Sequence, residues 1–143
     1  MRYTRVSVAV LDRLAGLAPE VKAVYFALLV GSHRTSAPGL FRAGPAALAE
    51  TCEVTPEVFA ACVAVLVDRG LVVADFTHRA VFLPHAVEDD APRNRDQVRS
   101  WRKVLDEIPA CPVKARAVAV LRRAAGAFAT DEKSGADLLG PSA

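Results

Sequence analysis

A helix, a turn, a second helix and a hairpin follow one another in the middle of the chain, and this order constrains the fold more than any other feature. Proline is favoured at the first position of a helix, so Pro45 and Pro56 mark two helix starts. Gly70 can adopt the positive φ that ends a helix. The expected elements are a strand at 40–42, helices at 45–52 and 55–69, and hairpin strands at 71–75 and 80–83. This order predicts a winged helix-turn-helix, in which the hairpin is the wing.

Further helices are expected on both sides of this stretch, because apolar residues recur there at helical spacing. They cover about 19–32, 96–107 and 113–128. The predicted fold class is mainly α with a small β-hairpin wing (α+β), a winged helix-turn-helix plus C-terminal helices. We expect a winged-helix domain at 1–87, an appended helical segment at 88–129 packed on it, and a disordered tail at 130–143 that has little to bury.

Composition limits the classes of function. The apolar runs fall short of the ~18 residues that a membrane span needs, so we expect a cytoplasmic protein that does not enter a membrane. Cys52, Cys62 and Cys111 are odd in number and form no CxxC pair, which favours free thiols. The histidines have no zinc-ligand spacing to one another or to a cysteine, and the motifs of nucleotide-binding, zinc-protease and serine-hydrolase sites are absent. We therefore expect no metal, no cofactor and no enzymatic activity.

Positive charge is concentrated in the C-terminal part of the chain. The formal net charge is +2, but residues 93–123 hold nine Lys or Arg against three Asp or Glu. Four of these cations fall on one side of the 96–107 helix, which we name the basic face: Arg95, Arg99, Arg102 and Lys103. Such a face repels itself unless a polyanion meets it, so it predicts phosphate contacts. Other candidate nucleic-acid-binding residues lie in and around the helix-turn-helix: Arg34, Thr35, Arg42, Thr55, His78 and Arg79.

The second helix of the helix-turn-helix has few residues that can read DNA bases. Reading in the major groove needs Arg, Lys, Asn, Gln, Ser or Thr near the helix N-terminus. The expected outward side instead carries Glu57, Ala60, Ala61 and Ala64, followed by Asp68. Two interpretations stay open. Either this side enters the groove, or it is an interaction face for another protein chain.

Five segments carry a family resemblance: YTRVSV at 3–8, VYFALLVGSHRTSAPGLFRAG at 24–44, LAE at 48–50, DRGLV at 68–72 and VRSWRKVLDEIP at 98–109. Together they resemble the winged-helix region of phage and prophage replication proteins, the initiator or replisome-organiser group related to DnaD-type domains. The resemblance implies binding to an origin or to single-stranded DNA, self-association, and contact with a helicase or its loader.

The sequence leads to one main hypothesis and two alternatives. The main hypothesis is a non-enzymatic DNA-binding winged-helix protein of the replication-initiation type, which contacts mostly the phosphate backbone of duplex or single-stranded DNA. The alternatives are a winged helix used as a protein-interaction or dimerisation module, and a transcriptional regulator. DNA is the expected partner, and a second copy of the chain and a replisome protein are further candidates.

Overall fold

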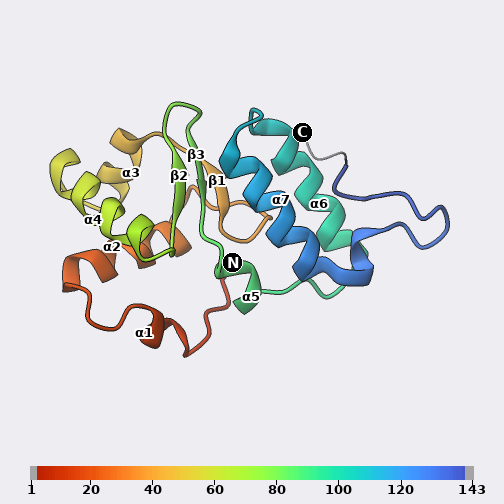
Figure 1. The fold of residues 1–143 in the computed structure, drawn as a ribbon, viewed down its shortest axis with the longest axis horizontal. Coiled ribbons are helices and arrows are strands. Elements are labelled where there is room, and N and C mark those ends of the chain that lie inside the picture. Colours follow the sequence, from red (N-terminus) through yellow and green to blue (C-terminus); the bar gives the residue numbers. More distant parts are fainter. Residues whose placement is uncertain (1–2, 141–143) are drawn as a thin grey trace.

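The computed structural model describes residues 3–140, which form an α+β fold of helices around one three-stranded sheet (Figure 1). This confirms the α+β class that the sequence predicts. The helices are α1 (Val10–Arg13), α2 (Pro19–Val30), α3 (Pro45–Thr51), α4 (Pro56–Asp68), α5 (Ala86–Asp89), α6 (Arg95–Glu107), α7 (Pro112–Ala125) and the short 3-10 helix η1 (Gly126–Ala129). The strands are β1 (Leu40–Arg42), β2 (Val73–Asp75) and β3 (Ala80–Phe82). Residues 1–2 of the expected first domain and 141–143 of the expected tail lie outside the described part.

The sheet is antiparallel and has β3 in its centre, with the strands in the order β1-β3-β2. Leu40 of β1 and Val73 of β2 both pair with Phe82 of β3. Because successive side chains of a strand point to opposite faces, Phe41 and Val81 face one side, and Leu40 and Phe82 face the other. Helices cover both faces, which gives three layers.

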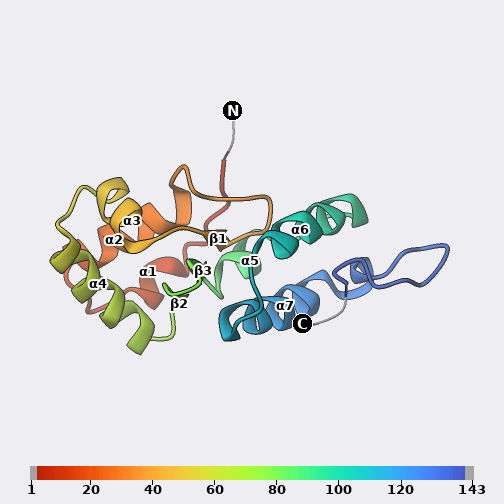
Figure 2. The same cartoon turned by 90° about the horizontal axis from the view of Figure 1, so that it is seen from above.

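The two outer layers have separate hydrophobic clusters, one on each side of the sheet. α2, α3 and α4 pack on the Phe41 side, where Tyr25 and Phe59 are fully buried. α6 and α7 pack on the other side, where Trp101 and Leu121 are buried against the sheet. Figures 1 and 2 both show the sheet between these two groups of helices.

Local sequence signals explain how the paired helices α3 and α4 begin and end. Both begin with proline, and the Thr55 hydroxyl caps α4 by accepting a hydrogen bond from the N–H of Val58 at 3.2 Å. Glu53 in the turn between them has a φ of 56°, and Gly70 after α4 has a φ of 76°. The helix starts and the glycine stop that the sequence predicts are confirmed.

An ion pair fixes the point where the chain leaves the sheet toward the third layer. Arg13 of α1 donates two hydrogen bonds to the Asp89 carboxylate of α5, at 3.0 and 3.2 Å. The side chain of Asp89 is only 7% exposed, and its hydrogen bonds raise the pKa of Arg13. Because Asp89 is buried, removing Arg13 would leave its carboxylate charged and without this partner, which is strongly destabilising. The pair therefore holds α5 against α1.

The described part of the C-terminal segment differs from the expected disordered tail. Thr130 and Asp137 form an isolated antiparallel bridge, and Leu139 is 3% exposed within the cluster of α6 and α7. The segment has few apolar residues, which is why the sequence predicts disorder. Hydrogen bonds from arginines of α6 and one buried leucine hold it nevertheless.

Candidate nucleic-acid interface

Three candidate DNA-binding residues gather at one end of the sheet, and we name them the hairpin-end cluster: Arg42, His78 and Arg79. Arg42 ends β1 and pairs with Ala80, the residue directly after Arg79. The N–H of Ala43 donates to the Arg79 carbonyl at 2.9 Å, which ties this end of β1 to the hairpin turn. The side chains of Arg42 and Arg79 are exposed, and neither has a hydrogen-bond or ion-pair partner within residues 3–140.

His78 differs from the two arginines because a carboxylate accompanies it. Its Nδ1 lies 2.7 Å from Oδ2 of Asp75, and its backbone N–H donates to Oδ1 of the same carboxylate at 3.2 Å. The side-chain hydrogen bond lowers the pKa of Asp75. The carboxylate offsets the charge that His78 could bring to a phosphate. The cations of the cluster that face solvent without a counterion are therefore Arg42 and Arg79.

The same end of the hairpin touches the start of α4. The ring centroid of Phe76, in the hairpin turn, lies 6.2 Å from that of Phe59 in the first turns of α4. This contact brings Thr55, the cap of α4, to the side of the molecule that carries the hairpin turn. Thr55 only accepts in its capping bond, so its hydroxyl proton is available to donate to a phosphate oxygen.

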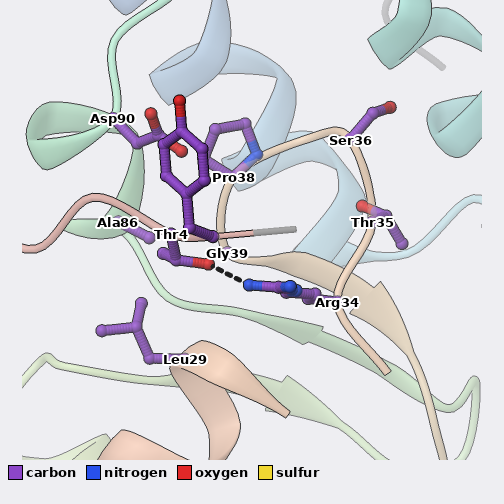
Figure 3. A pocket seen from close by; sticks show the side chains of 10 residues that line it. Thr4, Leu29, Arg34, Thr35, Ser36, Pro38, Gly39, Ala86 and Asp90 are labelled. Carbon is purple, nitrogen blue, oxygen red and sulfur yellow. Dashed lines mark hydrogen bonds between the residues drawn. The ribbon is translucent and has the colours of Figure 1, made fainter. Parts of the chain in front are cut away.

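Arg34 and Thr35 lie in the 31–39 loop and are engaged in contacts within the protein. Nη1 of Arg34 donates to Oγ1 of Thr4 at 2.7 Å, and the Thr35 hydroxyl donates to the Leu40 carbonyl at 2.6 Å. Both residues line a pocket of about 440 Å³ together with Asp90, whose pKa is raised by burial (Figure 3). One guanidinium and one carboxyl give this pocket little net charge, so it fits a phosphate poorly.

Two of the four cations on the basic face of α6 are paired with carboxylates of the protein. Arg99 lies 2.5 Å from an oxygen of Asp96 and 3.2 Å from an oxygen of Asp131. Nε of Arg102 lies 3.0 Å from Asp106. Asp96 and Asp106 lie three and four residues from their arginines, so the sequence alone could indicate these two pairs. Asp131 belongs to the C-terminal segment and is far from Arg99 in the sequence.

Arg95, the first cation of that face, holds the C-terminal segment instead of facing solvent. It donates to the Thr130 carbonyl at 2.9 Å, and its guanidinium lies 5.7 Å from the ring centroid of Phe128. Lys103 is exposed and has no hydrogen-bond or ion-pair partner in the part of the chain that the structure describes. α6, which carries this face, lies across the sheet from α4 (Figure 2). A short DNA segment bound at the hairpin turn and the start of α4 therefore does not reach the basic face.

The outward side of α4 is exposed and apolar. Its predicted members Glu57, Ala60, Ala61 and Ala64 are all exposed. Three exposed valines border this side, Val58 (37%) and Val65 (40%) along one edge and Val67 (46%) along the opposite edge. We name this surface the α4 outer side: Glu57, Val58, Ala60, Ala61, Ala64, Val65, Val67 and Asp68. It holds carboxylates near its two ends and no amide or cation that could read a base edge.

Reasoning from the sequence missed two features of these surfaces, the exposed valines of α4 and the partner of Arg99. The valines of the α4 outer side could have been found, because a buried arc through Phe59, Val63 and Leu66 leaves them facing solvent. The pairing of Asp131 with Arg99 carries no local signal, because 32 residues separate the two in the chain.

The comparisons with known proteins are negative. Neither a protein-family model, nor a curated protein, nor a solved structure matches this chain. Among the helices within residues 3–140, none has the length and the apolar character required to cross a membrane.

Proposed function

We propose that this chain is a non-enzymatic winged helix-turn-helix protein that binds DNA through phosphate contacts at the hairpin-end cluster. The observation that carries the proposal is the position of Arg42 and Arg79, exposed and without counterions in the described chain, beside the helix pair α3–α4. An arginine without a counterion contributes the most binding free energy when it contacts a phosphate, because no existing ion pair has to be broken first.

The order of elements supports the winged-helix part of the proposal. A strand, two short helices joined by a tight turn, and a two-stranded hairpin follow in that order, and the first strand pairs with the second hairpin strand. In such an arrangement the wing and the N-terminal end of the second helix lie on one side. Thr55, Arg42 and Arg79 belong to that end of the molecule.

The composition of the α4 outer side supports backbone contacts over base contacts. Alanines, valines and carboxylates cannot form the bidentate hydrogen bonds that distinguish base pairs. We therefore propose binding with little sequence preference. A role of the replication-initiation type follows from the resemblance of segments such as VRSWRKVLDEIP at 98–109 and is part of the proposal.

The test is a fluorescence-anisotropy titration of the full chain with duplex and single-stranded DNA at two salt concentrations. The variant pair Arg42→Gln and Arg79→Gln should lower the affinity roughly tenfold or more and reduce the log–log salt slope by about 0.9 for each phosphate that is no longer neutralised. The matched control is Arg116→Gln with Arg123→Gln, two exposed cations of α7 that carry the same change in net charge.

We expect the control to behave like the wild type. Absence of salt-dependent binding to either DNA would overturn the proposal. An equal decrease in affinity in both double variants would show that binding follows net charge instead of the hairpin-end cluster.

A second function is favoured by one observation, the exposed stripe of Val58, Ala61 and Val65 along one edge of the α4 outer side. Exposed apolar side chains gathered on one helix face are typical of protein interaction sites. In this alternative the chain is a winged-helix interaction or dimerisation module, and Glu57 and Asp68 contribute to the rim of the interface.

Light scattering coupled to size-exclusion chromatography tests this alternative over a range of protein concentrations. If the α4 outer side is a dimer interface, the wild type has a mass above that of a monomer and Val65→Glu is monomeric. Leu11→Glu is the matched control, because Leu11 is 67% exposed on a different helix. A wild type that stays monomeric at all concentrations contradicts the dimer form of this alternative.

A further inference from the structure

Three side chains with different metal-binding atoms meet where the hairpin turn approaches the start of α7. They are Asp75 at the end of β2, His78 in the turn and Cys111 at the N-cap of α7. One ligand atom from each residue lies within 4.8 Å of the other two. Nothing in the DNA proposal explains why a thiol lies beside this carboxylate and imidazole.

The carboxylate and imidazole are held in place before any ligand binds. The backbone N–H of His78 donates to one Asp75 oxygen at 3.2 Å, while His78 Nδ1 lies 2.7 Å from the other. Side-chain exposure is 23% for Asp75 and 41% for His78, and Cys111 is partly exposed. The three groups are therefore ordered by the turn and the helix start, and solvent can reach them.

The mixture of donors points to a particular class of cation. A thiolate and an imidazole together favour Zn²⁺ over the hard cations Mg²⁺ and Ca²⁺, which take oxygen ligands. We propose that Asp75, His78 and Cys111 bind one Zn²⁺ ion, with a water molecule as the fourth ligand. On binding, the Cys111 thiol forms a bond from sulfur to zinc and releases its proton to solvent.

The spacing of the ligand atoms is compatible with this proposal after a small adjustment. Zn–S and Zn–N bonds of about 2.3 and 2.0 Å in a tetrahedron place ligand atoms about 3.3–3.6 Å apart. No separation in the cluster exceeds 4.8 Å, so the widest has to close by at most about 1.5 Å to reach that range. The closest pair, His78 Nδ1 and Asp75 Oδ2 at 2.7 Å, has to open slightly. A rotation of exposed side chains such as His78 is enough, since none of the three residues is fully buried.

A bound ion would link two layers of the fold. Asp75 and His78 belong to the hairpin, whereas Cys111 begins a helix of the third layer. Zinc at this point would fix the hairpin turn to α7, and it would use the imidazole that the DNA proposal places near a phosphate. DNA contacts would then depend on Arg42 and Arg79. The inference stands without the proposed function, because its test measures metal binding alone.

The test uses the full chain, freed of metal by a chelator and titrated with Co²⁺ as a spectroscopic substitute for Zn²⁺. We expect one Co²⁺ per chain, with the near-ultraviolet charge-transfer band of a cobalt–thiolate bond and the visible bands of tetrahedral cobalt. Zn²⁺ should displace Co²⁺ and raise the midpoint of thermal unfolding. Circular dichroism confirms that each variant is folded before titration.

Matched variants identify the ligands. Cys111→Ser should remove the charge-transfer band, and His78→Gln should weaken binding about tenfold or more. Cys52→Ser is the control for the thiol, since Cys52 is also partly exposed. His85→Gln is the control for the imidazole, because His85 also pairs with an acid three residues away, at 3.2 Å from Glu88.

Three results would overturn the proposal. They are the absence of stoichiometric Co²⁺ binding by the wild type, a thiolate band that survives Cys111→Ser, and a band that Cys52→Ser removes instead. In each of these cases Asp75 and His78 form only a hydrogen-bonded pair that closes the hairpin turn.

Discussion

The hairpin-end cluster and the basic face of α6 are both rich in cations, yet their cations are in opposite states. The basic face has four cations within nine residues, and three of them are used by the protein itself, in contacts with Asp96, Asp106 and the C-terminal segment. The hairpin-end cluster has fewer cations, but Arg42 and Arg79 have no counterion within the described residues. The number of cations on a surface is therefore a weaker guide to polyanion binding than the number left unpaired.

The largest expected effect comes from removing the acids that pair with the basic face, which tests whether pairing keeps its cations from binding DNA. Asp96→Asn, Asp106→Asn and Asp131→Asn together should raise DNA affinity roughly tenfold at ~0.1 M salt, about the contribution of one additional phosphate contact. Anisotropy titrations at several salt concentrations measure both the affinity and its slope.

A control separates the removal of these particular acids from a change in net charge. Asp12→Asn, Glu20→Gln and Asp68→Asn remove three exposed carboxylates of α1, α2 and α4, on the other side of the sheet. If this control raises the affinity as much as the first triple variant, local pairing on α6 does not matter and the comparison fails.

Arg95→Ala should have the next largest effect, on stability instead of binding. It removes the hydrogen bond to Thr130 and the contact with the Phe128 ring, so we expect the free energy of unfolding to fall by about 1 kcal/mol. Urea denaturation measures this decrease, and limited proteolysis should show faster cleavage within 130–140. Lys103→Ala, which removes a cation without a partner in the described chain, should change the free energy by less than about 0.5 kcal/mol.

Charge reversal on the basic face should change DNA affinity only slightly. Arg99→Glu with Arg102→Glu should lower it by less than about threefold, because both guanidinium groups already have carboxylate partners. The measurement is the same anisotropy titration. A decrease of more than about tenfold would mean that DNA displaces these carboxylates, and the basic face would then rejoin the proposed interface.

The smallest effect concerns the titration of Asp131. Backbone N–H groups of Ser134 and Lys133, followed by Arg99, lower its pKa from 3.8 to about 2. A lowered pKa means that the folded form binds a proton less readily than the unfolded form. The contribution of Asp131 to stability is therefore complete above pH ~4 and is lost as the pH falls through about 2.

Carboxyl chemical shifts measured by NMR between about pH 1.5 and pH 5 report this titration. Arg99→Ala should move the midpoint upward while leaving it below 3.8, because the backbone donors remain. A wild-type midpoint at 3.8 would show that the turn around Asp131 does not form in solution.

Much of the fold could be predicted because its signals are local. Pro45, Pro56, Thr55 and Gly70 mark helix ends through effects on φ, on a missing N–H and on one capping bond, all within a few residues. The strand at 40–42 and the hairpin were predicted to within two residues at each end. These effects act within a few residues and do not depend on contacts with distant segments.

The candidate site was less predictable because its determinants are contacts between distant segments. The spacing of Arg95, Arg99 and Arg102 correctly places them on one side of a helix, but cannot show that residues 127–131 come back to meet them. In the same way, no local pattern joins Cys111 to His78, because β3, α5 and α6 lie between them in the chain. Charge patterns reveal faces, whereas pairing depends on the tertiary fold.

The central position of β3 has a consequence for synthesis on the ribosome. When the first 87 residues have emerged, Val81 already has its helical cover, but Phe82 and Leu40 still lack the side chains of α6 and α7. A nascent chain of that length carries an uncovered sheet face until Trp101 and then Leu121 leave the exit tunnel. During that interval the exposed face of the sheet depends on a trailing sequence that has not yet left the ribosome.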